Sequence, residues 1–323
     1  MSNTPPLHDL VIRNIVTYIQ RDNQTLINLQ LVCKRFYGLR DYFIKQIELD
    51  GEQSEYAFEN KPYGWNKVAY FTLTDYEELT DVSLLGSMSF LDIDGCQNLV
   101  DVSPLSGIHS LQLINCENVS DVSSLSRVHK LYIENCRSIT DVSALGTVYD
   151  LTLRVCYGIN DVSTLSGVHT LSIADCDIDD VSTLGTVYDL SICACNEIDD
   201  VSSLGTVHKL SLELLNINDV SRLGGVHELR FSRCPNINDV SALGNIYKLL
   251  LLSCDGITDV SGLKNVHELH IYYCQRISDV SALTSVYSLT LGDCNNITSN
   301  ILALKNPILK IDKCKISGIR NNL

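Results

Sequence analysis

Eleven aspartates recur at intervals of 19 or 20 residues, each as the first residue of an Asp-Val-Ser triplet. A row of carboxylates at constant spacing could hold a line of calcium ions, because calcium prefers oxygen ligands. An aspartate two residues before a backbone N–H can also close an Asx-turn, which keeps the carboxylate ionised without a metal. The same Val and Ser after every aspartate favour the turn. The column comprises Asp81, Asp101, Asp121, Asp141, Asp161, Asp180, Asp200, Asp219, Asp239, Asp259 and Asp279.

A second column contains six histidines and four tyrosines in register. Histidines in a row could form a metal-binding stripe or a pH switch. Tyrosine alternates freely with them, however, and the two residue types share a flat ring and a polar tip rather than metal affinity. The column therefore predicts rings that stack along one edge of a repeat structure. Its members are His109, His129, Tyr149, His169, Tyr188, His208, His227, Tyr247, His267 and Tyr287.

Eleven of the 13 cysteines form a third column with the same spacing, and Leu215 stands where one further cysteine is due. Leucine can replace a small buried thiol but not a disulfide partner, so we expect reduced, buried thiols in a reducing compartment. Zinc would need closely spaced cysteine pairs, and the nearest approach is Cys193 with Cys195. The column comprises Cys96, Cys116, Cys136, Cys156, Cys176, Cys195, Cys234, Cys254, Cys274, Cys294 and Cys314.

No arrangement of residues typical of catalysis occurs in the chain. It lacks a Gly-x-Ser-x-Gly elbow, a His-Glu-x-x-His motif and a glycine-rich phosphate loop, so we expect no enzymatic activity and no cofactor.

The net charge of the chain is −15. Residues 1–50 contain six basic and five acidic residues, which gives +1, whereas residues 51–323 contain 18 basic and 34 acidic residues, which gives −16. So acidic a body repels phosphate, which argues against nucleic-acid and anionic-membrane partners.

The N-terminal sequence and the hydropathy pattern bear on location. No apolar run approaches the roughly 20 residues of a membrane helix. The first ten residues, MSNTPPLHDL, lack the basic start and apolar core of a signal peptide. We therefore expect an intracellular, cytoplasmic protein.

The three columns belong to one repeat, represented by residues 128–147, VHKLYIENCRSITDVSALGT. Its Leu-x-Ile alternation predicts a short strand with two inward side chains, and the cysteine follows where the chain turns. One unit is too short to bury its own apolar face, so consecutive units must stack into a parallel sheet over a continuous core. Twenty residues leave no room for an α-helix on the return side, where we expect turns and short 3₁₀ segments.

This skeleton resembles the leucine-rich-repeat pattern L-x-x-L-x-L-x-x-N/C-x-L over residues 68–316. The half of the repeat that contains Asp-Val-Ser is similar to the short repeats of bacterial internalins. The cysteine in place of asparagine is similar to that of the cysteine-containing repeats of F-box proteins. The resemblance implies an α/β repeat solenoid, an arc of about 13 coils with one long parallel β-sheet. We expect a linker and N-terminal cap at residues 49–67, a capping strand within residues 45–50, and a tail at residues 317–323.

Residues 1–48 do not follow the repeat. Apolar positions at 7, 10–12, 15–16 and 19 predict a helix, and Thr25 is a candidate N-cap for a further helical segment, residues 26–39. We expect a three-helix unit of about 40 residues, which is too small to build a large core alone. It resembles an F-box across residues 5–48, although His8 and Leu10 replace the family's proline and acidic residue. The resemblance assigns adaptor binding to Leu7, Val11, Ile12, Ile15, Leu26, Leu31, Val32, Cys33 and Phe36.

The F-box resemblance implies a function. An F-box docks on the Skp adaptor of a cullin-RING (SCF-type) ubiquitin ligase, and the attached repeats select the target protein. The near-identical coils are similar to F-box and repeat proteins of giant amoebal viruses, in which case the Skp-type adaptor and the cytoplasm would be the host's. The alternative is a structural or protein-interaction repeat protein that recruits no ligase.

The repeat resemblance implies that exposed strand residues form a concave binding face. Most coils present small polar residues there, whereas the segments LRFSRC, LLLLSC and LHIYYC carry the Arg, Tyr and exposed Leu side chains that are typical of interfaces. A patch that arose by neutral drift is the alternative. We call these residues the late-strand patch and expect them to bind a target protein: Arg230, Arg233, Leu250, Leu252, His270, Tyr272 and Tyr273.

Overall fold

The computed structural model describes residues 47–48, 70–86, 88–298, 301 and 304–314. The nine candidate adaptor-binding residues and the predicted tail lie outside these ranges, as do the predicted helices of the F-box-like unit. The chain divides into two compact units, with the boundary in the sequence between Ser138 and Ile139. We call them the first and the second unit and describe each by itself.

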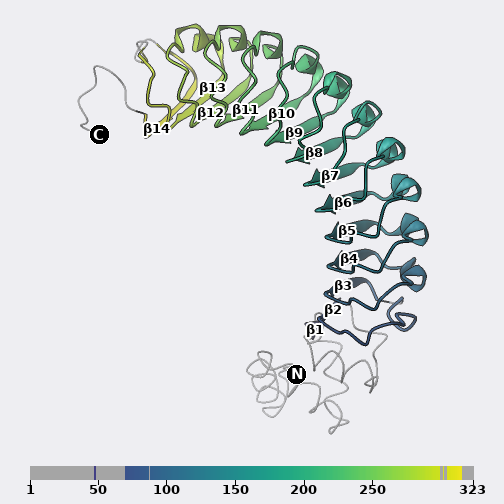
Figure 1. Cartoon of the computed structure of the whole chain (residues 1–323). Coiled ribbons are helices and arrows are strands. Elements are labelled where there is room, and N and C mark those ends of the chain that lie inside the picture. The colour runs from purple at the N-terminus through teal and green to yellow at the C-terminus, as the bar shows by residue number, and fades with distance from the viewer. Residues whose placement is uncertain (1–46, 49–69, 87, 299–300, 302–303, 315–323) are drawn as a thin grey trace, which may run out of the picture. The chain divides into compact units, whose positions relative to one another are not determined.

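Each coil of the repeat contributes one strand of five residues, and a shorter strand, β1, precedes them at the position expected for a cap. Within each unit every strand pairs in parallel with its neighbours in the sequence (Figure 1). The strands of the first unit are β1 (Ile47–Glu48), β2 (Tyr70–Thr74), β3 (Phe90–Asp94), β4 (Ser110–Ile114) and β5 (Lys130–Glu134). Those of the second unit are β6 (Asp150–Arg154), β7 (Thr170–Ala174), β8 (Asp189–Cys193), β9 (Lys209–Glu213), β10 (Glu228–Ser232), β11 (Lys248–Leu252), β12 (Glu268–Tyr272), β13 (Ser288–Gly292) and β14 (Ile308–Asp312).

The core forms because the second and fourth residues of strands β2 to β13 point inward and are buried. In β5 these are Leu131 and Ile133, which are 1% and 0% exposed. Val142 and Leu145, from the return side of a coil in the second unit, are buried to the same degree. Most residues at the outward first, third and fifth strand positions form a surface, which we call the strand face. The exceptions are buried: Ser110, Ser232, Thr290 and Gly292.

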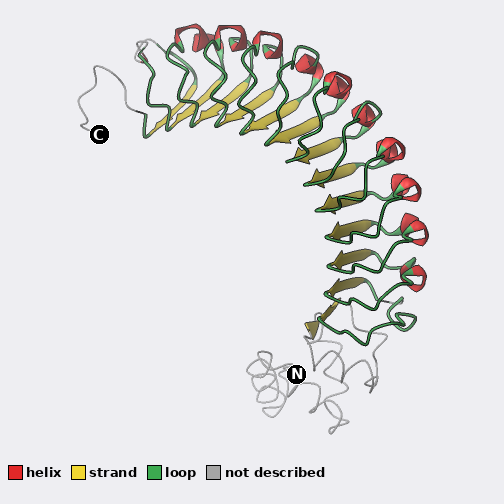
Figure 2. Ribbon diagram, in the orientation of Figure 1, coloured by secondary structure: helices red, strands yellow, loops and turns green. Residues whose placement is uncertain are grey.

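The return side of the coils is built from 3₁₀ turns, which confirms the prediction made from coil length. Figure 2 shows these turns on the side of each coil opposite the strands. Among the described residues there is no α-helix, and no helix long and apolar enough to cross a membrane. The 3₁₀ segments are η2 (Ser103–Leu105), η3 (Ser123–Arg127), η4 (Ser143–Thr147), η5 (Ser163–Gly167), η6 (Leu184–Thr186), η7 (Ser202–Thr206), η8 (Leu223–Gly225), η9 (Ser241–Leu243), η10 (Ser261–Leu263) and η11 (Ser281–Ser285).

Candidate functional site

The aspartate column closes turns. Each carboxylate accepts a hydrogen bond of 2.7–2.9 Å from the backbone N–H of the serine two residues later, which confirms the predicted Asx-turns. The Ser123 hydroxyl and backbone N–H lower the pKa of Asp121, and Ser163 acts in the same way on Asp161. Within the described ranges, no group of three or more His, Cys, Asp or Glu side chains could hold a metal ion.

The His/Tyr column forms stacked rings, as predicted. In the second unit the rings from Tyr149 to Tyr287 make one series, with neighbouring centroids 4.4–4.8 Å apart and interplanar angles of 5–24°. In the first unit His109 stacks on His129 at 4.7 Å. Because the ring faces cover one another, the edges of the rings are what solvent meets.

The cysteine column is free of disulfides, and ten of its eleven thiols are buried. Burial raises the pKa of Cys254 to about 12 and that of Cys274 to about 11, so these two thiols stay protonated at neutral pH. Leu215 fills its position in the column with no exposed surface. The prediction is wrong for Cys314, which is only half-buried because it follows β14, the last strand that the structure describes.

Three adjacent strands, β10, β11 and β12, bring the late-strand patch together. In register, Leu250 lies between Arg230 and His270, and Leu252 lies beside Tyr272. All five are outward strand residues.

Arg233 and Tyr273 occupy a different position from the other five patch residues. Each follows the last residue of its strand in a left-handed backbone conformation, with φ of 52° and 55°. Their side chains therefore extend the patch beyond the carboxyl ends of β10 and β12.

Sequence reasoning missed the ion pairs on this part of the strand face. Glu213 on β9 places one carboxylate oxygen 3.9 Å from an Arg230 nitrogen and the other 3.6 Å from an Arg233 nitrogen. The first residues of neighbouring strands also alternate in charge and form a row across the sheet. In two pairs of this row, Lys209 with Glu228 and Lys248 with Glu268, the lysine nitrogen lies 3.8 and 3.7 Å from a carboxylate oxygen. The only signal for this row in the sequence is a change of sign at each repeat interval, through Asp189, Lys209, Glu228, Lys248 and Glu268.

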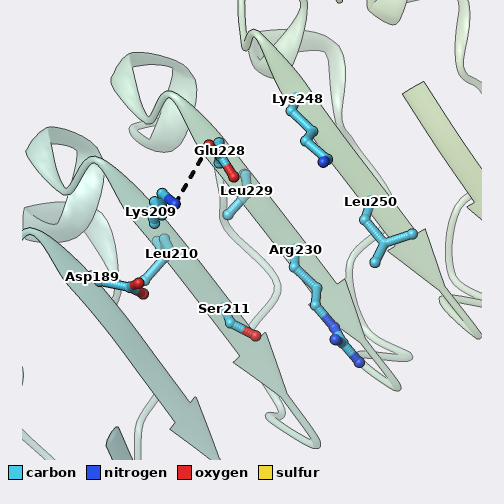
Figure 3. A pocket seen from close by; sticks show the side chains of 9 residues that line it. All are labelled: Asp189, Lys209, Leu210, Ser211, Glu228, Leu229, Arg230, Lys248 and Leu250. Carbon is cyan, nitrogen blue, oxygen red and sulfur yellow. Dashed lines mark ion pairs between the residues drawn. The ribbon is translucent and has the colours of Figure 1, made fainter. Parts of the chain in front are cut away.

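A shallow cavity of about 220 Å³ opens on the strand face over β8 to β11 (Figure 3). It shares Arg230 and Leu250 with the late-strand patch. Sites for small molecules usually have about 300–1,000 Å³, so this cavity better suits a single side chain of a partner. Its lining residues are Asp189, Lys209, Leu210, Ser211, Glu228, Leu229, Arg230, Lys248 and Leu250.

The β12 side of the patch is apolar. The ring of Tyr272 lies over Gly292 of β13, so close that a Cβ added at Gly292 would clash with a ring carbon. Burial, and then the nearby Lys248, lower the pKa of His270. At neutral pH His270 therefore contributes an uncharged ring beside Leu250 rather than a further cation.

Comparisons with known proteins show the fold. No protein-family model matches the sequence, and a search of curated proteins gives no significant match. An internalin from Listeria monocytogenes is 22% identical in sequence, with a TM-score of 0.57 over 79% of this chain and 84% of its own. At that identity the similarity establishes the architecture alone, and the chain has the leucine-rich-repeat fold.

Two further structures are more distant. The functional domain of InlJ from Listeria monocytogenes, described as including a cysteine ladder, is 17% identical, with a TM-score of 0.46 over 77% of this chain and 69% of its own. The leucine-rich-repeat domain of the type III effector XopL is 15% identical, with a TM-score of 0.39 over 97% of each chain.

Proposed function

We propose that this chain recognises a target protein through the late-strand patch and recruits a ubiquitin ligase through its N-terminal segment. The observation that carries target recognition is a change of residue type along one row of the strand face. In register from β6 to β9 the middle outward residues are Thr152, Ser172, Ser191 and Ser211. From β10 to β12 they are Arg230, Leu250 and His270.

Binding is favoured over catalysis by the chemistry of this surface. Arginine and tyrosine contribute most of the binding energy in many protein interfaces, and leucines exposed on a surface add apolar contact area. The three strands β10 to β12 span only about 10 Å. A standard interface of about 800 Å² per partner therefore requires neighbouring coils to take part, and strands β8 and β9 are the nearest on one side.

Target recognition is tested by capture of a partner with the full chain and two sets of variants. Arg230→Ala and Tyr272→Ala should each weaken the complex by about 2 kcal/mol or more if they are hot spots. Gln112→Ala and Thr152→Ala are matched controls from the same row of earlier coils and should change affinity little. If the control variants lose the partner and the late-strand variants keep it, the patch is not the binding site.

Recruitment of a ligase rests on the F-box resemblance of residues 5–48. We expect the full chain to co-purify with a eukaryotic Skp adaptor. The double variant Leu7→Asp, Val32→Asp should abolish capture, because each aspartate would place an unpaired charge in an apolar interface. Equal adaptor recovery by the wild type and this variant would contradict the ligase role and leave an interaction protein that recruits no ligase.

A further inference from the structure

The strand face of β9 to β11 is locally cationic within an acidic chain. Counting each strand and the residue after it, four cations (Lys209, Arg230, Arg233 and Lys248) face two carboxylates (Glu213 and Glu228), so 4 − 2 gives a local charge of +2. The whole chain carries −15. This locally cationic area overlaps the late-strand patch on β10 and β11.

The donors of the two arginines are open to a ligand. Their nitrogens lie 3.6–3.9 Å from the Glu213 oxygens, whereas charge-assisted hydrogen bonds measure about 2.7–2.9 Å. Neither guanidinium donates a hydrogen bond to any residue that the structure describes. Each has five N–H donors in a planar fork that fits a carboxylate or a phosphate. Their side chains are 46% and 62% exposed, so a partner can reach them.

Apolar side chains lie beside these donors. Leu250 and Leu252 are half-buried on β11, one strand from Arg230, and Tyr272 follows on β12 with its ring turned toward β13. With strands about 4.8 Å apart, the apolar area begins about 5 Å from Arg230 and is centred within about 10 Å of it.

We propose that the ligand of this face is an extended peptide segment of a partner that carries an anionic group two or three residues from a large apolar side chain. The anionic group, a carboxylate or a phosphate, lies between Arg230 and Arg233, and the apolar side chain covers Leu250, Leu252 and Tyr272. Side chains on the same side of a peptide are about 7 Å apart at two residues in a β-strand and about 9 Å apart at three residues in a polyproline II helix. Both distances match the separation of the two parts of the patch. This inference rests on the proposed target-recognition function.

Glu213 has a defined role in this arrangement. Its carboxylate occupies the neighbourhood of both guanidinium groups and repels an incoming anion. Removal of its charge should therefore strengthen the binding of an acidic peptide, although no contact with the peptide is added.

The test is a selection of random linear peptides displayed on phage against the full chain, followed by affinity measurements with synthetic copies of the selected peptides. We expect Asp or Glu two or three residues from Leu, Phe or Tyr. The double variant Arg230→Ala, Arg233→Ala should reduce affinity roughly tenfold or more, since hydrogen bonds to charged groups are lost. Phosphoserine in place of the acidic residue distinguishes the two anions: tighter binding indicates a phosphate site, and weaker binding a carboxylate site.

A second pair of variants isolates the charge effect. Glu213→Gln should raise the affinity for the acidic peptides several-fold. Glu117→Gln changes the net charge by the same amount on an exposed residue of the first unit and should have no such effect. Equal effects of the two variants would overturn the role of Glu213, because both would then act through net charge alone.

The outcomes separate this inference from the function on which it rests. Selected peptides that lack an acidic residue but depend on Leu250 and Tyr272 would overturn the anionic ligand and leave target recognition standing. Peptides that bind equally well to every late-strand variant would overturn both. Failure to select any peptide above a phage-only control would overturn the peptide ligand.

Discussion

At the scale of single residues, the position after each strand is the most demanding in the repeat. Twelve residues other than glycine adopt a φ of 49–55° there, and Gly95 occupies the same position with a φ of 70°. Asn115 and Asn135 suit this conformation and form a short ladder, in which the Asn135 side chain donates to Asn115 at 2.8 Å. Val155 does not suit it, because a β-branched side chain crowds the backbone at positive φ.

This strain leads to a stability prediction. Val155→Asn should raise the free energy of unfolding by about 1 kcal/mol, because asparagine tolerates the left-handed region. Val155→Ala is the matched control, since it removes the branched side chain without adding the preference of asparagine. Chemical denaturation followed by circular dichroism measures both variants. An asparagine variant no more stable than the wild type would contradict the strain argument.

At the scale of the elements, strand register decides which side chains become neighbours. The pairing of Tyr272 with Gly292 leaves room for the tyrosine ring beside β13 and fixes the apolar side of the patch. The same register brings Glu213 close to Arg230 and Arg233 from the next strand. The binding surface therefore depends on residues that need not touch a ligand.

Gly292→Ala tests the first of these relationships. The added Cβ would displace the Tyr272 ring, whereas the backbone of β13 would keep its pairing because the clash is with a movable side chain. We expect an unchanged melting temperature and weaker binding of the target. The control is the same substitution in the Tyr272→Ala background, where no ring remains to be displaced and no further loss should occur.

The cysteine column makes a second prediction at this scale. In a Cys33→Ser background, native protein should react with a thiol reagent at Cys193 and Cys314, which are half-exposed, before any of the ten buried column cysteines. Mass spectrometry of partly labelled protein identifies the sites. Rapid labelling of most of the column without denaturant would be incompatible with a packed core.

Periodicity in the sequence predicted most of the architecture, because side chains in one column share one environment. The turn role of Asp121, the stacking of Tyr149 and the replacement of a cysteine by Leu215 all follow from repetition. The contacts of the late-strand patch break the repeat and could not be predicted in this way. The ion pairs of Glu213 depend on the angle at which two long side chains leave neighbouring coils. The end-of-strand location of Arg233 could have been predicted from the Asn, Asp and Gly residues found at that position in other coils.

At the scale of the whole molecule, negative charge dominates, and its distribution shapes the response to acid. Hydrogen bonds from serine lower the pKa of eight aspartates of the aspartate column. The folded-state pKa of these groups lies below the unfolded value of about 3.9. Their contribution to stability is therefore present above that value and is lost as pH falls through the lowered folded-state pKa.

We accordingly expect two separate events on acidification. Near pH 4.8, the isoelectric point of the sequence, the protein should lose solubility while it remains folded. Unfolding should follow only below about pH 4, as the turn aspartates become protonated. Acid titration at low protein concentration, followed by circular dichroism, measures the second event. Asparagine at positions 121, 161 and 200 should make this loss of stability less steep, and full stability at pH 2 in the wild type would contradict the argument.

The constant register of the strands has a consequence for how such a chain can change over generations. A gene made of near-identical segments gains or loses whole segments by unequal crossing-over, and a coil added in this way pairs with its new neighbours as well as any other. A coil inserted between β9 and β10 would move Glu213 about 4.8 Å further from Arg230 and Arg233. One recombination event could therefore release both arginines from their carboxylate and alter ligand preference without a single point mutation.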